Sequence, residues 1–409
     1  MVTEIKANPD RKNDRDESLK LIDWFEIDRV RAAKMMIVGA GAIGNEVMKN
    51  LALLGIGNIY IIDLDTIEVS NLSRSILYRA SDAGQLKAEV AARAVREINP
   101  NVNVIWQKGD IRFDVGLGLF RQMDVVIGCL DNRHARMAIN RKCWKVNRPW
   151  IDAGIGVLNG QVAVFQPGVS ACYECSFTQQ DYEQVILPCN QRASLYMREG
   201  KIPTTPTIAS LVAAIQVQES LKLLDPERWE QRNLIGRELI FDGTNAYVDI
   251  FGRPFNAGCP AHSRIDPATI VELLEYGADN ITASGLLALA RERLGPNAHL
   301  ELNFDMVIER RCRVCQTATR FLRPSDSLHF EDMLCDRCGE QGYEVLTKNL
   351  GLEVKDYEED FLELPLSKLS VPPLDIIRAY GERGRQINFE LTGDVGRVLD
   401  FSRDGCASQ

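Results

Sequence analysis

The chain lacks an excess of basic residues, a long apolar run and an apolar leader. Lys and Arg number 48 against 57 Asp and Glu, a net charge of −9, whereas a chain that coats nucleic acid is expected to be basic. No uninterrupted apolar stretch approaches the roughly 18 residues that span a bilayer, and the first 20 residues are too polar for a secretory signal. We therefore expect neither a nucleic-acid partner nor a membrane partner, and we expect a cytoplasmic location.

In the cytoplasm, paired cysteines are not expected to form structural disulfide bonds, because thiols are kept reduced there. The chain has 11 cysteines, and most of them fall in C-x-x-C pairs. Hydrophobic residues make up 45% of its 409 residues, near the globular average of about 45–50%. A chain of this length with an ordinary core is expected to form roughly two or three domains.

Residues 35–63 have the pattern of one βαβ unit. A short apolar run precedes a Gly-rich turn, apolar residues then recur at helical spacing, and a second apolar run follows two glycines. The alternation of strands and helices continues, and it predicts an α/β fold with a Rossmann-like, doubly wound, mostly parallel sheet. The further predicted helices are 87–98, 135–146 and 207–224, and the further predicted strands are 102–106, 123–129 and 161–165.

Gly39, Gly41 and Gly44 form the pattern G-x-G-x-x-G between a predicted strand and a predicted helix. Such glycines allow a tight turn and let the backbone approach phosphates, which the helix N-terminus attracts. Asp63 lies at the end of the next strand, where a carboxylate can accept hydrogen bonds from ribose hydroxyls. The pattern indicates a nucleotide site, and an NAD-dependent oxidoreductase is its default interpretation.

The residues after Asp63 change that interpretation. The sequence D-L-D-T-I-E-V-S-N-L-S-R at 63–74 resembles the ThiF/MoeB superfamily, which includes the ubiquitin-activating enzymes. The resemblance continues through G-Q-L-K-A-E at 84–89, N-P at 99–100, D-N at 131–132 and C-x-x-C at 172–175. It covers about residues 15 to 265, although Ala42 and Ser75 replace a glycine and a glutamine that are common in the family.

The resemblance implies an adenylation site for ATP and Mg²⁺. Cations suit this chemistry because a carboxylate that attacks the α-phosphate generates charge, and a metal ion orients the pyrophosphate leaving group. Among the implied residues, Arg74, Lys87 and Asp131 are the catalytic ones. The implied ATP-binding residues besides the three glycines are Asp63 at the ribose, Asp65, then Asn71, Arg74 and Lys87 at the triphosphate, Asp131 at Mg²⁺, and Arg15, which would reach the ATP of the partner subunit in a homodimer.

Cys172 and Cys175 form half of a tetrahedral metal site. In similar proteins the other half is a later C-P-x-C, and this chain has Cys259 and His262 in the corresponding pattern C-P-A-H. Zinc accepts thiolate and imidazole ligands alike. The resemblance therefore implies a Cys₃His zinc site at the end of the adenylation fold.

A second set of cysteines has the spacing of a zinc ribbon. Cys312, Cys315, Cys335 and Cys338 form two C-x-x-C pairs with nineteen residues between them, within the range typical of such sites. The sequence thus predicts two Zn²⁺ ions in all. A closed Cys₄ site is more often structural than catalytic, and the spacing leaves the role of the ribbon open.

The remaining cysteines are Cys129, Cys143, Cys189 and Cys406, of which the first two are expected to be buried. Cys189 lies in a loop-like segment, 176–206. In similar activating enzymes this crossover loop passes over the adenylate and carries the cysteine that receives the acyl group. Basic residues near Cys189 can lower its pKa, and the thiolate is the nucleophile. We therefore expect Cys189 to be the acyl acceptor.

Four parts of the chain follow from these patterns. They are an ATP-binding adenylation domain over 1–265, a helical connector and strand over 266–305, a Cys₄ zinc ribbon over 306–345 and a small acidic C-terminal region over 346–409. Within the connector, spacing predicts helices over 270–276 and 284–294 and a strand over 299–309.

The resemblance implies that the protein adenylates the C-terminal glycine of a ubiquitin-like protein, forms a thioester on Cys189 and transfers the acyl group to a conjugating enzyme. One alternative is a sulfur-carrier protein adenylyltransferase for cofactor biosynthesis, disfavoured because no rhodanese-like domain is recognisable after residue 265. Another is a non-catalytic interaction protein built on an ATP-binding fold, which intact Arg74, Lys87 and Asp131 disfavour.

Overall fold

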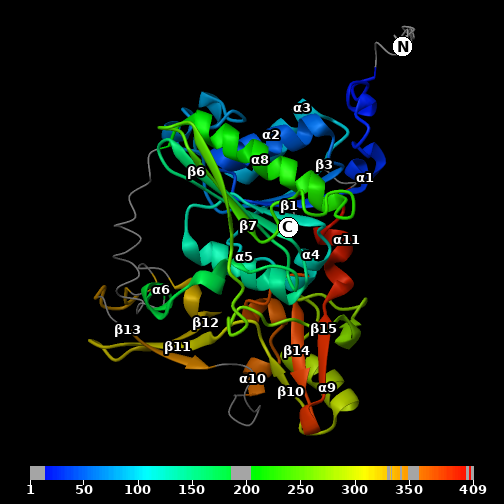
Figure 1. Ribbon diagram of the computed structural model, residues 1–409. Coiled ribbons are helices and arrows are strands. Elements are labelled where there is room, and N and C mark those ends of the chain that lie inside the picture. Colours follow the sequence, from blue (N-terminus) through cyan, green and yellow to red (C-terminus); the bar gives the residue numbers. More distant parts are fainter. Residues whose placement is uncertain are drawn as a thin grey trace, which may run out of the picture.

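The computed structural model describes residues 14–185, 204–328, 332, 334–340, 343–348, 359–401 and 405–406. Figure 1 shows a large sheet between two layers of helices, and a second unit below one of these layers. Within the described ranges, no helix is both long and apolar enough to cross a membrane.

The large sheet has nine strands in the order β16-β3-β2-β1-β4-β5-β6-β7-β8. Its strands from β16 to β5 are parallel to their neighbours, whereas β6, β7 and β8 extend it in antiparallel fashion. The doubly wound, mostly parallel sheet expected from the sequence is confirmed. The strands are β1 (Lys34–Val38), β2 (Asn58–Asp63), β3 (Asn103–Lys108), β4 (Val125–Gly128), β5 (Trp150–Ile155), β6 (Asn159–Phe165), β7 (Arg237–Asp242), β8 (Tyr247–Gly252) and β16 (Gly405–Cys406).

Helices cover both faces of this sheet. α2 (Ala42–Leu54), α3 (Lys87–Ile98) and α8 (Pro206–Leu224) share one apolar core with the sheet, and α4 (Leu117–Arg121) and α5 (Arg133–Lys145) share the other. α8 begins where the sequence suggests, because Thr205 caps it and Pro206 fills its first position. Two short helices, α1 (Ile27–Ala32) and α6 (Gln179–Val185), complete this unit.

A four-stranded sheet, in the order β10-β14-β15-β9, forms the second unit with α9 packed on it. Strands from residues 266–305 and from residues 346–409 share this sheet. The helix predicted over 270–276 is wrong, because residues 270–272 pair in parallel with β15 and are held extended by that ladder. The elements are β9 (Ile270–Glu272), α9 (Ala283–Leu294), β10 (His299–Glu301), α10 (Glu359–Leu362), β14 (Ile376–Tyr380), β15 (Gln386–Glu390) and α11 (Val395–Val398).

The cysteine-rich module is inserted between β10 and β14. It is a three-stranded antiparallel sheet of β11 (Met306–Cys312), β12 (Ala318–Pro324) and β13 (Tyr343–Lys348). The single strand predicted over 299–309 is therefore two strands, β10 and β11, which belong to different sheets.

The second unit packs tightly on α4 of the first. The Asp375 carboxylate accepts from the Leu117 backbone N–H at 2.9 Å, and the Gly118 N–H donates to the Leu374 carbonyl at 2.8 Å. A Cβ on Gly118 would lie 2.5 Å from the backbone carbonyl oxygen of Leu374, so only glycine fits there. Arg121 pairs with Glu390, which is buried.

A partly buried lysine lies beside this interface. The Lys142 ammonium on α5 donates to the carbonyls of Ile111 at 3.0 Å and Val115 at 2.6 Å. Burial lowers the pKa of Lys142 to about 8 in spite of the nearby Asp375 carboxylate. Below that pH the fold holds a charged ammonium away from water.

This burial predicts a specific pH dependence of stability. Between pH 8 and the ordinary lysine pKa near 10.5, Lys142 is neutral when folded and protonated when unfolded. The unfolded state then binds more protons, so stability rises with pH by up to about 1.4 kcal/mol per unit. Urea unfolding from pH 7 to 10 should show this rise for the native chain relative to Lys142→Met, with Lys49→Met as a matched control. Parallel pH curves for the native chain and Lys142→Met would contradict the assignment.

Candidate functional site

The predicted nucleotide residues gather at the carboxyl ends of β1 and β4. These strands are neighbours, and the helices that follow them, α2 and α5, cover opposite faces of the sheet. In doubly wound sheets ligands bind in the crevice at this point, where the strand order reverses.

The three glycines of the turn have different roles. Gly39 has φ +98°, and a Cβ there would lie 2.5 Å from the Cys129 carbonyl oxygen. A Cβ on Gly44 would lie 2.0 Å from the Gly39 carbonyl oxygen, so packing requires glycine at both positions. A Cβ on Gly41 would meet no protein atom within 4 Å. The space beside Gly41 is therefore open to a ligand.

Asp63 joins the end of β2 to the Gly-rich turn. Its carboxylate accepts from the Ala40 N–H at 2.6 Å and from the Asp65 N–H at 2.8 Å. Burial raises the pKa of Asp63, and nearby Lys87 opposes that effect. Each carboxylate oxygen keeps a second lone pair, so the group can still accept from a ribose hydroxyl.

Lys87 lies at the start of α3 and reaches the same place. Its ammonium is 2.7 Å from a carboxylate oxygen of Asp65, with side chains 12% and 55% exposed respectively. The structure thus brings Asp63, Asp65 and Lys87 together beside the glycine turn. A phosphate group that reached Lys87 would compete with the more exposed Asp65 carboxylate for the Lys87 ammonium.

The segment after Asp65 holds two further predicted residues. Asn71 is buried, and its side-chain oxygen accepts from the Glu68 N–H at 3.0 Å, which fixes a short 3₁₀ turn. Arg74 is partly exposed and donates to the Ser70 carbonyl at 2.8 Å. The segment therefore presents the Arg74 guanidinium from a turn that Asn71 holds in shape.

Asp131 lies three residues after the end of β4 and is exposed. The next residue, Asn132, caps α5 by accepting from the Ala135 N–H at 2.8 Å. Within the described part of the chain, the Asp131 carboxylate accepts no hydrogen bond. Hard cations such as Mg²⁺ prefer carboxylate oxygens, so this side chain fits the role that the sequence predicts.

Two residues that the sequence analysis missed hold the glycine turn in place. The Asn45 amide donates to the carbonyls of Ala40 at 2.8 Å and Gly41 at 2.9 Å, and it accepts from the Leu77 N–H at 3.0 Å. The Tyr78 hydroxyl donates to the Ala40 carbonyl at 2.6 Å, and burial raises its pKa. The sequence could have indicated Asn45, because it is a polar residue on the apolar, buried face of α2, one helical turn before Met48.

The predicted Cys₃His set comes together as expected. The ligand atoms of Cys172, Cys175, Cys259 and His262 all lie within 4.8 Å of one another. The imidazole of His262 stacks on Trp144 of α5, with ring centroids 4.0 Å apart. Three thiols and one imidazole in this arrangement match the donor set of a tetrahedral zinc site.

The four cysteines of the ribbon also converge, with ligand atoms within 4.8 Å of one another. The sulfurs of Cys312 and Cys338 are 3.7 Å apart, and those of Cys315 and Cys335 are 3.6 Å apart. This donor set likewise fits zinc.

The remaining cysteine predictions have different outcomes. Cys129 and Cys143 are buried as expected. Cys189 lies outside the described residues, together with most of the predicted crossover loop, so its role stays a prediction.

Arg15 lies away from the glycine turn of its own chain. Its guanidinium donates to the carbonyl of Ile98 at 2.7 Å, at the end of α3. The chain passes from there into β3, so Arg15 lies toward the amino ends of the parallel strands, whereas the turn lies at their carboxyl ends. Its predicted contact with a partner subunit stays a prediction.

The two clusters predict two zinc ions per chain. Protein purified from zinc-supplemented medium should contain about two equivalents by mass spectrometry of metals, because each cluster offers four ligands. Cys259→Ser and Cys335→Ser should each retain about one, and Cys143→Ala, a buried cysteine outside both clusters, should retain both. Full loading of either ligand variant would contradict the assignment of that cluster.

The chain is similar in sequence to known activating enzymes. SUMO-activating enzyme subunit 2 of Dictyostelium discoideum is 43% identical over 149 residues, which are 36% of this chain and 22% of the relative. Ubiquitin-like modifier-activating enzyme 5 of Caenorhabditis briggsae is 28% identical over 242 residues, which are 56% of this chain and 52% of the relative. The chain thus spans about a fifth to about a half of the length of these curated relatives.

Solved structures share the fold. The crystal structure of E. coli MccB with ATP has a TM-score of 0.52 and 22% identity, over 63% of this chain and 75% of that chain. Its complex with succinimide has a TM-score of 0.51 and 24% identity, over 61% and 74%.

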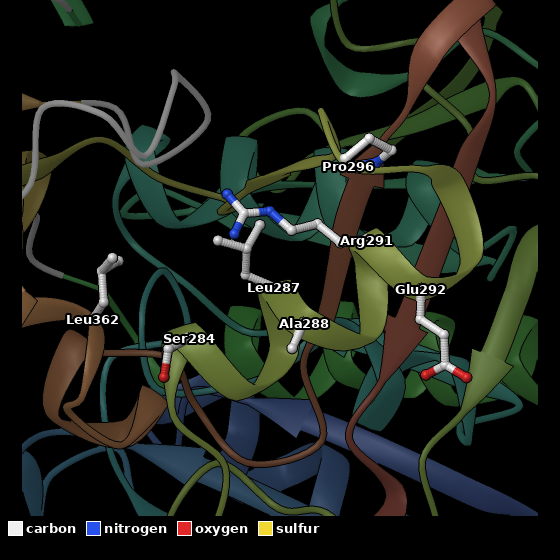
Figure 2. A pocket seen from close by; sticks show the side chains of 7 residues that line it. All are labelled: Ser284, Leu287, Ala288, Arg291, Glu292, Pro296 and Leu362. Carbon is white, nitrogen blue, oxygen red and sulfur yellow. The ribbon is translucent and has the colours of Figure 1, made fainter.

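A hollow on the second unit lies apart from the site (Figure 2). It has a volume of about 670 Å³ and lies along the outer side of α9. Its lining includes one basic and one acidic side chain, and it lacks the convergent polar groups of a typical small-molecule site. The lining residues are Ser284, Leu287, Ala288, Arg291, Glu292, Pro296 and Leu362.

The sequence model of the ThiF family matches residues 14–261, which include every described residue of the nucleotide site and most of the large sheet. This match extends over well more than half of the chain. The chain belongs to the ThiF family.

Proposed function

We propose that the chain is an ATP-dependent enzyme that adenylates the C-terminal glycine of a ubiquitin-like protein. The observation that carries the proposal is the group of Asp63, Asp65 and Lys87 beside a glycine turn with open space at Gly41, at the point where the strand order reverses. Two of the curated relatives are named for the activation of SUMO and of a ubiquitin-like modifier. Their names supply the proposed class of substrate.

In the first proposed step, an oxygen of the glycine carboxylate attacks the α-phosphorus of ATP. The bond from that phosphorus to the oxygen bridging to the β-phosphate breaks, and pyrophosphate leaves with its electrons. Lys87 and Arg74 would neutralise the charge that develops. Asp131 would hold Mg²⁺, which supplies charge neutralisation and orientation of the pyrophosphate when it is bound.

In the second proposed step, the thiolate of Cys189 attacks the carbonyl carbon of the acyl-adenylate. A carbon–sulfur bond forms, AMP leaves, and the thioester then passes to the thiol of a conjugating enzyme. The sequence resemblance supports this assignment. The flanking elements are compatible with this assignment. In the sequence, α6 follows Cys172 and Cys175 of the Cys₃His cluster, and the segment that carries Cys189 connects α6 to Thr205, the cap of α8.

A homodimer is part of the proposal. In such a dimer, Arg15 would be presented to the ATP of the partner subunit. The contact of Arg15 with the end of α3 supports this, because it keeps the side chain away from the turn of its own chain.

The first experiment mixes the protein with ATP, Mg²⁺ and a panel of glycine-ended ubiquitin-like proteins. We expect pyrophosphate exchange into ATP and a thiol-sensitive adduct by intact mass and non-reducing electrophoresis. Cys189→Ala should retain exchange and lose the adduct, whereas Cys143→Ala should retain both.

Two other results would change the assignment. Exchange without any adduct would favour sulfur-carrier adenylation and leave Cys189 without the proposed role. Absence of exchange with every acceptor would remove the adenylation proposal.

The open space at Gly41 gives a separate test of the nucleotide site. Gly41→Ala should keep the native melting temperature, because the added methyl group meets no protein atom within 4 Å. It should weaken ATP binding by about tenfold, or about 1.4 kcal/mol, because the methyl group occupies the phosphate path. Calorimetric titration with ATP measures this change. Gly44→Ala is the contrasting variant and should lose stability, since its Cβ would lie 2.0 Å from the Gly39 carbonyl. Native affinity in Gly41→Ala would place the phosphates elsewhere.

A further inference from the structure

β4 and β5 separate just before they reach the candidate site. Their ladder covers only two residue pairs, Val126 with Trp150 and Ile127 with Ile151. β5 nevertheless continues to Ile155, paired with β6 on its other side. β4 ends at Gly128, so beyond this ladder β4 and β5 are unpaired at the carboxyl edge of the sheet, and this unpaired stretch forms a split between them.

A buried guanidinium bridges this split from the α5 face. One terminal nitrogen of Arg136, Nη2, donates to the carbonyls of Leu130 at 2.8 Å and Ala153 at 2.7 Å. The Nε of the same side chain lies 3.2 Å from the Asp152 carboxylate, and the two side chains are 14% and 4% exposed. Arg136 thus joins the residue immediately before Asp131 to the backbone of β5.

A second polar side chain enters from the opposite face. Gln216 of α8 is fully buried, and its amide donates to the Gly128 carbonyl at 2.9 Å. Gly128 is the last residue of β4. The backbone between Gly128 and Leu130 is therefore held by side chains from both helical layers, in addition to β1, whose Val38 carbonyl accepts from the Cys129 N–H at 2.8 Å.

Stability alone is a poor explanation for this arrangement. A buried ion pair is often no more stabilising than apolar residues of similar volume, because both charges lose their hydration. Burial raises the pKa of Asp152 to about 6 even with Arg136 beside it. The pair lies where the backbone leads into Asp131.

We propose that Arg136 and Gln216 are positioning residues, which hold β4 and β5 apart and thereby set the place of the Asp131 carboxylate for a divalent cation. The inference rests on the proposed adenylation function. Fixing the carbonyls of Gly128 and Leu130 leaves little freedom in the backbone that carries Asp131. The positive charge of Arg136 also attracts the Asp131 carboxylate.

The test measures metal binding directly. Mn²⁺ replaces Mg²⁺ as the probe, and its affinity is read by electron paramagnetic resonance in the presence of a non-hydrolysable ATP analogue. Arg136→Gln should raise the dissociation constant of Mn²⁺ by about tenfold or more, the usual effect of removing a group that orients a metal ligand. The affinity for the analogue in EDTA should stay unchanged, because neither residue is placed at the nucleotide.

The matched control is Arg121→Gln, which removes a guanidinium paired with a buried carboxylate at the unit interface, away from β4 and β5. It should lower the melting temperature and leave Mn²⁺ affinity unchanged. Gln216→Leu should also weaken Mn²⁺ binding. If Arg136→Gln does not fold, the Mn²⁺ affinity of Gln216→Leu tests the positioning role instead. Native Mn²⁺ affinity in both variants, with only a lower melting temperature, would overturn the inference.

The two proposals fail in distinguishable ways. A native chain that binds Mn²⁺ with the analogue but catalyses no pyrophosphate exchange with any acceptor would overturn the proposed function alone. A native chain that binds no Mn²⁺ in the presence of the analogue would overturn the assignment of Asp131 and the positioning role with it.

Discussion

The described structure depends above all on one stripe of α5. Arg136, Asn140 and Trp144 are spaced four residues apart, so they lie on one face of the helix in successive turns. Arg136 bridges the ends of β4 and β5, Asn140 donates to Glu174 at 3.1 Å in the loop of the Cys₃His cluster, and Trp144 stacks on His262. One helix therefore links the carboxyl edge of the sheet, which carries the candidate site, to the Cys₃His cluster.

This constraint explains why so many polar groups are buried near α5. Glu174 is fully buried between Cys172 and Cys175 in the sequence, and its burial is tolerable because Arg141 and Asn140 donate hydrogen bonds to its carboxylate. A charged pair of this kind contributes little net stability. It does fix the loop that carries Cys172 and Cys175, which leads directly into the segment of the predicted acyl acceptor.

The sequence predicted the parts of the site that local patterns determine. The glycine turn and Asp63 follow from one βαβ unit, the four-cysteine set follows from cysteine spacing, and the Cys₃His set was implied by the family resemblance. The side chains of each cysteine set converge as expected. Strand β9 could not be predicted from local sequence, because its three residues are extended only through pairing with β15, which is distant in the sequence. The role of Arg136 could not be predicted either, because an arginine in a helix is expected at the surface unless the positions of the carbonyls that it contacts are known.

The second unit contacts the other end of the same helix. The Lys145 ammonium donates to the Asn303 side chain at 3.0 Å, and the Lys145 carbonyl accepts from the Ile265 N–H at 2.9 Å. Figure 1 shows this unit below α4 and α5, on the side of the sheet away from α2, α3 and α8. Its contacts thus brace the C-terminal end of α5, whereas Asp131 precedes the N-terminal end. Among the described residues, these contacts of the second unit therefore stabilise α5 at the end opposite to Asp131 and the glycine turn.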